Sequence, residues 1–442
     1  MALIRVIGLY FRCFFNSVLR KNNVYSLAYT GLSQSHSYRL QQGANTDLLI
    51  GFRYLKKALA LSWKNADGAI VHGIGNTAIF DAAAESMKAR YSYISTITGE
   101  SPKIFLHKED LALQQSLLQR VIEVLFMILF SLWIIPLSIV SSKRGSYALN
   151  LLEIVENARL IQHLRKHKIS KLYYFCGFNK DANFAAVLLQ KNQIICHKVP
   201  SSNPIKNFYQ FVIADVFSFT APYQKQEYEH LKANWMVDRF EEWPVFHFEQ
   251  IQGILNKYKT PKTNTLGFIS SGIWRRIERG DNALGVGEYD SELRLIAFLK
   301  LYLNQNPQIQ LFIFLHPIEK NNPEHYLKAQ SHYQKVLGTN NIEFFEPSIP
   351  SFKLFDRVDL SVAAYSSANL ERLYAGFKTL YAPLGIRSDY YADSSLNNIA
   401  AFDEKSLETL LNNSFEMNGE AFFEQNELQA YHNKYYLLLF QS

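Results

Sequence analysis

Short apolar runs alternate with helical patterns through most of this sequence, and the alternation constrains the fold more than any other feature. The run "KLYYFCGF" (residues 171–178) is followed by a helical pattern over 179–192 and then by "QIICHKVP" (193–200). The alternation resumes at "TLGFIS" (265–270) and continues to "KTLYAPL" (378–384). Strands that alternate with helices form parallel sheets through right-handed crossovers. The sequence therefore predicts an α/β fold.

The length of the chain indicates more than one domain, because 442 residues exceed one ordinary hydrophobic core. The polar stretch "NKYKTPKTNT" (256–265) is the best linker. We predict two Rossmann-like domains facing a cleft, with one added apolar, membrane-associating helix. The expected parts are an amphipathic helix over residues 1–24, an N-terminal domain over 25–255, a C-terminal domain over 262–415 and a C-terminal helix over 416–442.

The segment "VIEVLFMILFSLWIIPLSIV" (121–140) is the strongest indication of contact with a membrane. About 20 apolar residues are long enough to cross a bilayer. A spanning helix would place the two α/β parts on opposite sides of the membrane, so we favour a monotopic helix that dips into one leaflet. A helix buried between the domains and a spanning helix are the alternatives.

The first 24 residues form a second amphipathic pattern. Its polar face carries Arg5, Gly8, Arg12, Asn16 and Arg20, and its apolar face carries Ile4, Ile7, Phe11, Phe14, Phe15 and Val18. A basic, aromatic-rich helix can lie on an anionic membrane surface. Packing of the same helix on the protein's own core is the alternative, and the pattern does not choose between them.

Composition limits the partners and the compartment. With 48 % hydrophobic and 19 % charged residues, the chain is not disordered. Cys13, Cys176 and Cys196 lie too far apart for a disulfide framework or a zinc site, which favours the reducing cytoplasm. The net charge of +7 suits anionic partners. Because no nucleic-acid motif accompanies that charge, we expect a nucleotide and a membrane surface, and a peripheral or monotopic protein of the inner membrane.

The C-terminal half places polar residues where its strands end. In an open parallel sheet, ligands gather at the carboxyl ends of the strands. Ser271 and Gly272 follow one predicted strand, and His316 with Pro317 ends the strand "IQLFIFLHP". A histidine there could donate a hydrogen bond to a phosphate and stabilise a leaving group. A satisfied core histidine is the alternative.

A third loop, "YSSANLE", leads from a predicted strand into a helix. Ser366 or Ser367 would lie among the free N–H groups at the helix start, where a phosphate is favoured. Glu371, one turn later, could accept hydrogen bonds from ribose hydroxyls. The alternatives are a serine that only caps the helix and an ordinary surface glutamate.

The pair "FLHP" and "YSSANLERLYAG" resembles the paired His-Pro and Ser-Ser motifs of bacterial two-Rossmann (GT-B type) glycosyltransferases, including the sialyltransferase-like and capsule-polysaccharide enzymes that use CMP-activated sugars. The resemblance covers roughly residues 262–390. It implies that His316, Ser366 and Ser367, and with them Glu371, contact the donor nucleotide on the C-terminal domain.

The sequence departs from that family in one respect, because the acidic Asp/Glu-Asp/Glu-Gly triplet common in its N-terminal domains is absent. Asp181, after a predicted strand, is the nearest counterpart of the catalytic base, and His72 is a second possibility. No DxD motif lies in a suitable loop, so we expect a reaction without a metal or another cofactor.

These features together predict a membrane-associated cytoplasmic glycosyltransferase in surface polysaccharide or lipopolysaccharide assembly. It would transfer a sugar from a nucleotide-sugar donor to a glycan or lipid-linked acceptor. Asp181 would deprotonate the acceptor and His316 would stabilise the departing phosphate. A sugar-nucleotide epimerase of the same architecture and a non-catalytic polysaccharide export or assembly factor are the rival interpretations.

Overall fold

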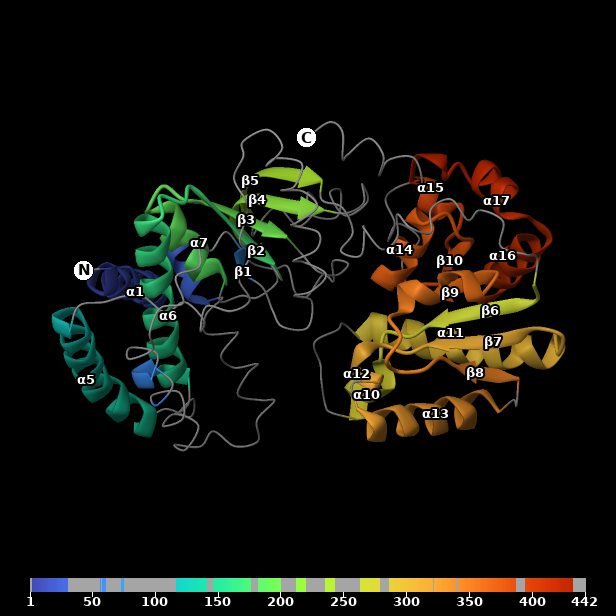
Figure 1. The fold of residues 1–442 in the computed structure, drawn as a ribbon, viewed down its shortest axis with the longest axis horizontal. Helices are drawn as coiled ribbons and strands as arrows, with labels where there is room; N and C mark the ends of the chain where they lie inside the picture. The colour runs from blue at the N-terminus through green and yellow to red at the C-terminus, as the bar shows by residue number, and fades with distance from the viewer. Residues whose placement is uncertain are drawn as a thin grey trace. The chain divides into compact units, whose positions relative to one another are not determined.

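The computed structural model describes residues 2–30, 56, 58–60, 73–74, 117–140, 146–175, 182–199, 212–219, 235–242, 263–278, 286–320, 322–338, 341–386 and 394–431. The chain divides into two compact units (Figure 1). Unit 1 comprises Met1–Ser201, Phe208–Phe219 and Glu229–Trp243, and unit 2 comprises Ser202–Asn207, Thr220–Tyr228 and Pro244–Ser442. Each unit contains a five-stranded sheet whose strand pairs are all parallel. The predicted α/β class is therefore confirmed.

The sheet of unit 1 runs across its described strands in the order of the sequence. The strands are β1 (Gly73–Ile74), β2 (Lys171–Phe175), β3 (Ile195–Val199), β4 (Val212–Phe219) and β5 (Trp235–Glu242). The sequence predicts β2 and β3 but not β4 or β5. β4 reads "VIADVFSF" and is buried on both faces, so it has no polar and apolar alternation by which a strand is recognised.

The helices of unit 1 whose bounds are described are α1 (Ala2–Val18), α5 (Leu117–Val140), α6 (Ser146–Lys166) and α7 (Ala182–Gln190). α6 lies between α5 and the sheet (Figure 1) and contacts α1, α5 and α7. α6 is enclosed on all sides, because its apolar residues Leu151, Ile154, Val155, Ala158, Ile161 and Leu164 are buried and so are Glu153, Asn157 and Arg159.

One face of α1 packs on the protein's own core, and it matches the predicted apolar face only in part, because Ile7 and Phe11 of that face pack against the core. The buried residues are Leu3, Val6, Leu9, Tyr10 and Cys13, whereas Ile4, Phe15 and Val18 are exposed. The Asn150 side-chain amide donates to the Tyr10 hydroxyl at 2.8 Å and joins α1 to α6. The assignment from sequence was partly wrong because apolar residues occur on every side of this helix. The spacing of the arginines alone therefore does not identify the buried side.

The apolar segment 121–140 lies within α5, as expected of a helix. Met127 and Phe130 of α5 are buried in the core of unit 1. Where side chains are described, the structure contains no helix that is long and apolar enough to cross a membrane.

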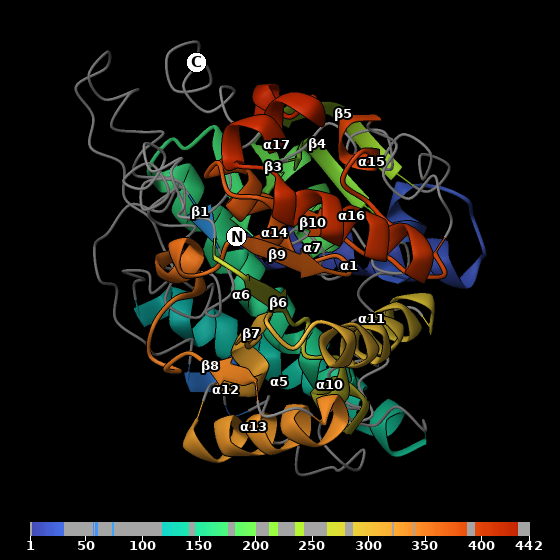
Figure 2. The same ribbon diagram turned by 90° about the vertical axis from the view of Figure 1, so that its right-hand side faces the viewer.

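The sheet of unit 2 has a reversal at its centre. Its strands are β6 (Thr265–Ile269), β7 (Gln310–Phe314), β8 (Ile342–Phe344), β9 (Leu360–Ala363) and β10 (Thr379–Tyr381), and their order is β10-β9-β6-β7-β8 (Figure 2). The chain moves outward from β6 to β8 and then crosses back to place β9 on the other side of β6. The winding direction therefore reverses between β6 and β9, which is a topological switch point.

Helices of unit 2 connect and cover these strands. They are α10 (Ile273–Glu278), α11 (Val286–Gln305), α12 (Pro317–Lys320), α13 (Pro323–Leu337), the 3₁₀ helix η5 (Ser351–Arg357), α14 (Ser367–Tyr374), α15 (Ser394–Asn397), α16 (Glu404–Glu416) and α17 (Gly419–Gln425). One sequence expectation changes. Within residues 416–442, the described helix α17 is shorter than predicted.

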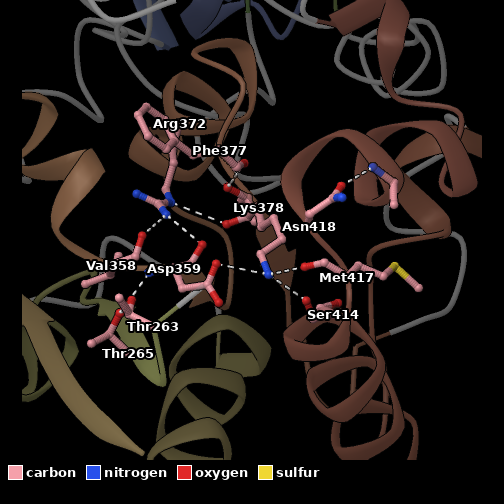
Figure 3. Close-up of polar contacts among 12 residues, drawn as sticks. Thr263, Thr265, Val358, Asp359, Arg372, Phe377, Lys378, Ser414, Met417 and Asn418 are labelled. Atoms are coloured by element: carbon pink, nitrogen blue, oxygen red, sulfur yellow. Dashed lines mark hydrogen bonds and ion pairs between the residues drawn. The ribbon is translucent and has the colours of Figure 1, made fainter. Parts of the chain in front are cut away.

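A buried arginine holds together the strand ends on the β9 side of the sheet (Figure 3). The Arg372 guanidinium of α14 is fully buried and donates to the backbone carbonyls of Val358 at 2.7 Å and Asp359 at 3.3 Å. It also donates to the carbonyl of Phe355 at the end of η5. One side chain thus satisfies several carbonyls that no strand or helix would satisfy.

A buried lysine beside it joins the sheet to α16 (Figure 3). The Lys378 ammonium lies 3.0 Å from an Asp359 carboxylate oxygen and donates to the carbonyls of Ser414 and Met417, each at 2.7 Å. These carbonyls lie at the end of α16, where the helix dipole favours a cation. Lys378 therefore acts as the C-terminal cap of α16, with Asp359 as its counter-ion.

Candidate functional site

The three loops that the sequence singles out lie at one end of one sheet. β9, β6 and β7 are neighbours, and the loops at their carboxyl ends lead into α14, α10 and α12, which gather at the same end of the unit 2 sheet (Figure 1). Neighbouring strands are about 4.8 Å apart, so the two outer loops are separated by roughly 10 Å. The switch point between β6 and β9 falls within this group, and such points are where α/β sheets bind ligands.

Gly272 brings the loop after β6 into direct contact with the loop after β7. Its φ is +72°, in the left-handed region that favours glycine. A Cβ atom at this position would lie 2.6 Å from Ile318 Cγ2 and 3.3 Å from His316 Cβ. Glycine is therefore required both by the backbone conformation and by the closeness of His316.

His316 is a neutral hydrogen-bond donor with a fixed tautomer. The Ile318 backbone N–H donates to His316 Nδ1 at 3.2 Å, so Nδ1 carries no proton and the ring proton resides on Nε2. Burial, together with the charges of Arg276 and Lys320, lowers the pKa of His316 to about 3. The half-buried ring can therefore donate through Nε2, as the sequence interpretation requires, but it does so without a positive charge.

The Glu319 side chain holds the backbone of His316 in place. This carboxylate is fully buried and accepts hydrogen bonds from the His316 N–H at 2.8 Å and the Tyr333 hydroxyl at 2.9 Å. It also accepts from the Trp274 indole N–H. Burial raises the pKa of Glu319, and these hydrogen bonds oppose that shift. Glu319 therefore positions His316 rather than facing a ligand itself.

Glu292 of α11 does the same for the loop after β6. One oxygen accepts from the Ser271 N–H at 2.9 Å, and the other accepts from the Ile273 N–H at 3.4 Å. Burial, and next the nearby charge of Glu319, raises the pKa of Glu292 to about 7. The backbones of the two loops are thus held by hydrogen bonds to two buried carboxyl groups, Glu292 and Glu319.

The sequence interpretation gave neither carboxyl group a role. A signal for Glu292 exists, because it shares the apolar face of α11 with the buried residues Leu295 and Leu299, at helical spacing. Glu319 stands one turn into the short helix after His-Pro, and nothing in that pattern distinguishes it from an exposed acid. Its burial depends on Tyr333 and Trp274, which come from other elements.

The loop after β9 contains a cap. Ser366 is the N-cap of α14, and its hydroxyl accepts from the Ala368 N–H at 3.3 Å. The capping interpretation is therefore confirmed for Ser366, while contact of Ser366 and Ser367 with a phosphate stays a prediction. Glu371 is only 9 % exposed, so it is not an ordinary surface glutamate. Pro317 is exposed at the first position of α12, where proline suits a helix.

The predicted catalytic bases of unit 1, Asp181 and His72, lie outside the described residues. The described strands instead bring together His197, Ser218 and Glu241 near the carboxyl ends of β3, β4 and β5. His197 Nε2 is 2.6 Å from the Ser218 hydroxyl, and Nδ1 is 3.5 Å from a Glu241 oxygen.

This Ser–His–Glu chain, which the sequence interpretation also missed, has the members of a nucleophile triad but not its exposure. His197 and Ser218 are fully buried, whereas the Glu241 side chain is 31 % exposed. The nucleophile of a triad must be able to contact its substrate, whereas the Ser218 hydroxyl lies in the protein interior. The geometry fits an internal polar link across three strands, with a hydrogen bond between His197 and Ser218 and a longer contact between His197 and Glu241.

The sequence matches no protein-family model, and no curated protein is similar to it in sequence. Solved structures with a similar fold include the UDP-GlcNAc 2-epimerase of Neisseria meningitidis bound to UDP-GlcNAc (9 % identity, TM-score 0.44, 84 % of this chain and 98 % of that chain). They also include Acinetobacter baumannii MurG (12 % identity, TM-score 0.41, 84 % of this chain and 98 % of that chain). A third is a glycosyltransferase of Rickettsia africae ESF-5 (10 % identity, TM-score 0.43, 84 % of this chain and 100 % of that chain). At these identities and TM-scores, likeness in fold does not identify the activity of the chain.

Proposed function

We propose that the chain is a nucleotide-sugar glycosyltransferase whose donor binds at the carboxyl edge of the unit 2 sheet. The observation that carries this proposal is the switch point between β6 and β9, with the fixed Nε2–H donor of His316 beside it. The Nε2–H group of His316, together with the start of α14, where the helix dipole favours an anion, suits a phosphate.

In this proposal, His316 donates to the phosphate that leaves with the nucleotide. A neutral donor keeps the same charge throughout the reaction, so its hydrogen bond strengthens only as negative charge develops on the leaving oxygen. The Arg276 and Lys320 charges, which act on His316, add a favourable potential for an anion. Ser271, Gly272, Pro317, Ser366, Ser367 and Glu371 complete the proposed nucleotide site.

The acceptor side of the proposal rests on the sequence. Asp181 is the proposed base that removes the acceptor proton, and a glycan or lipid-linked acceptor at the cytoplasmic face of the membrane is the proposed substrate. No metal or other cofactor is invoked, since the hydrogen-bond donors of unit 2 supply the stabilisation that leaving-group departure needs.

Calorimetry with CMP, UDP and GDP tests the nucleotide site. We expect one nucleotide to bind the full-length protein, and His316→Ala to weaken its binding by about tenfold or more, because a hydrogen bond to a charged group contributes roughly 1.5–3 kcal/mol. His167→Ala, a substitution in the turn that follows α6 in unit 1, is the control and should bind as the wild type. Equal affinity of wild type and His316→Ala would remove His316 from the site.

Turnover of the matching nucleotide-sugar then separates the rival functions. Release of free nucleotide only with an added acceptor is the result expected of a transferase. Conversion of the sugar without any acceptor would identify an epimerase. A protein that binds no nucleotide at all would be an assembly factor, and the proposal would be abandoned.

A further inference from the structure

Helix α5 turns its apolar side outward. Eight large aliphatic residues of this helix are between 40 % and 70 % exposed: Leu117, Leu118, Val121, Ile122, Leu125, Ile128, Leu129 and Leu132. They recur at steps of three and four residues, so they share one continuous side of the helix, here named the outer face of α5. An apolar patch of this size on a protein surface marks an interaction site.

Two polar residues of α5, Glu123 and Ser131, lie on its buried side. Glu123 is only 8 % exposed, and its carboxylate lies 3.7 Å from the guanidinium of the buried Arg159 on α6. Ser131 is also buried, and its hydroxyl donates to the Met127 carbonyl at 2.6 Å. A helix that borders water shows its charged side to solvent. α5 has the opposite arrangement, which suits a helix that borders hydrocarbon.

We propose that the outer face of α5 inserts into the surface of a lipid bilayer, with the helix lying in the plane of the membrane. Lipid is favoured over a protein partner by the composition of the face. Its eight members are all Leu, Ile or Val, whereas protein interfaces concentrate Tyr, Trp, Arg and Met at their centres. Acyl chains are as apolar as leucine and need no specific partner groups.

Charge on the neighbouring helix favours anionic lipid. α1 contacts α5 through Tyr10 and Phe11, whose rings pack against Phe130. The same helix exposes Arg5 and Arg12, and Arg20 is exposed just beyond its end. Basic residues close to an inserted apolar face attract anionic headgroups and strengthen binding at the interface. The net charge of +7 acts in the same direction.

This surface is independent of the nucleotide site, because all of its residues belong to unit 1 and the proposed donor site belongs to unit 2. Loss of lipid binding would therefore leave nucleotide affinity unchanged, and a failed glycosyltransferase proposal would leave the lipid surface standing.

Co-sedimentation of the full-length protein with phosphatidylcholine vesicles, with and without phosphatidylglycerol, tests the proposal. We expect binding that is stronger to the anionic vesicles. The double variant Leu125→Glu/Leu129→Glu should weaken binding by at least about tenfold, since it places two charges where two leucines would enter lipid. The single variants Leu301→Glu and Leu327→Glu are matched controls. Both leucines are 63 % exposed, as Leu129 is, but they lie in unit 2.

A second measurement keeps the test decisive if the double variant does not fold. Tryptophan at the outer face, in Leu129→Trp, should be quenched by brominated lipid in the vesicles more strongly than in Leu327→Trp. The proposal would be overturned if the wild-type protein bound neither kind of vesicle, or if the two tryptophan variants were quenched equally. It would also be overturned by a dimer in light scattering that Leu125→Glu/Leu129→Glu converts to monomer while vesicle binding persists, because the face would then join two copies of the chain.

Discussion

At the residue scale, the fixed tautomer of His316 determines how the proposed nucleotide binding should vary with pH. Its pKa is lowered to about 3, so protonation of the ring is complete only in strong acid and the Nε2–H donor persists at higher pH. We expect the ratio of wild-type to His316→Ala affinity to stay constant between about pH 5 and pH 8, because the ring of His316 does not titrate there. Calorimetry across that range is the measurement. A ratio that changes near pH 6.5 would show that His316 binds as a cation.

Glu292 makes a second prediction at this scale, and it concerns stability. Its pKa in the folded protein is about 7, above the ordinary value of 4.5. A carboxyl group with a raised pKa stabilises the fold fully below pH 4.5, and this contribution is lost as the pH rises towards 7, at up to about 1.4 kcal/mol per pH unit. Glu292→Gln should therefore reduce the fall in the free energy of unfolding between pH 5 and pH 8.

Urea unfolding at the two pH values measures this difference. The control is Glu404→Gln, because Glu404 is exposed and its pKa is lowered through its hydrogen bond to Arg294. That substitution should keep the fall seen in the wild type. If Glu292→Gln keeps it as well, then Glu292 does not titrate in this range.

These residues also show where reasoning from sequence reaches its limit. His316, Ser271 and Gly272 were identified because a strand end and a glycine are visible in the sequence. Glu292 and Glu319 were not, because burial of a carboxylate depends on tertiary contacts between α11, α13 and the loops. The role of Glu371 was open for the same reason, since its 9 % exposure follows from packing of the whole of α14.

At the element scale, the contact between two loops depends on Gly272. Gly272→Ala adds a Cβ only 2.6 Å from Ile318 and forces alanine into a φ of +72°. Such strain costs about 1–3 kcal/mol, and its relief would displace the loop that carries His316. We expect a lower melting temperature together with nucleotide affinity lowered by about tenfold or more.

Gly338→Ala is the matched control for this element. Gly338 ends α13 with a φ of +64°, and an added Cβ would meet only Lys300, at 3.5 Å. This variant should lose stability and keep its affinity for nucleotide. Comparable losses of affinity in both variants would mean that the effect is a general destabilisation rather than a displacement of His316.

The link between β10 and α16 makes the second prediction at this scale. Lys378→Met removes the cation that lies 3.0 Å from Asp359 and that caps the carbonyls of Ser414 and Met417. Breaking a buried pair on one side costs about 3–5 kcal/mol. Adding Asp359→Asn should recover part of that loss, because the unpaired charge is then gone. Chemical unfolding of the two single variants and the double variant measures the coupling, and additive effects would show that the two groups are independent.

At the scale of the whole molecule, the sequence predicts the class of fold from its alternation of strands and helices. β6, β7 and β9 were all predicted, and they are the strands that hold the candidate site. β4 and β5 were missed, since burial on both faces removes the alternation from β4 and since β5 carries charged residues throughout "WMVDRFEE". The order of the strands, and with it the switch point, is a property of pairing between distant segments and has no local signal.

That order also has a consequence for folding kinetics. On one side β6 pairs with β7, where Leu266 lies opposite Leu311. On the other side β6 pairs with β9, where Leu266 lies opposite Leu360, at about twice the sequence separation. Pairings of larger sequence separation form more slowly because more chain entropy is lost before they are made. The proposed nucleotide site spans both pairings, so it would form only after the slower pairing has formed. In stopped-flow refolding, helical circular dichroism should therefore recover before a fluorescent nucleotide begins to bind.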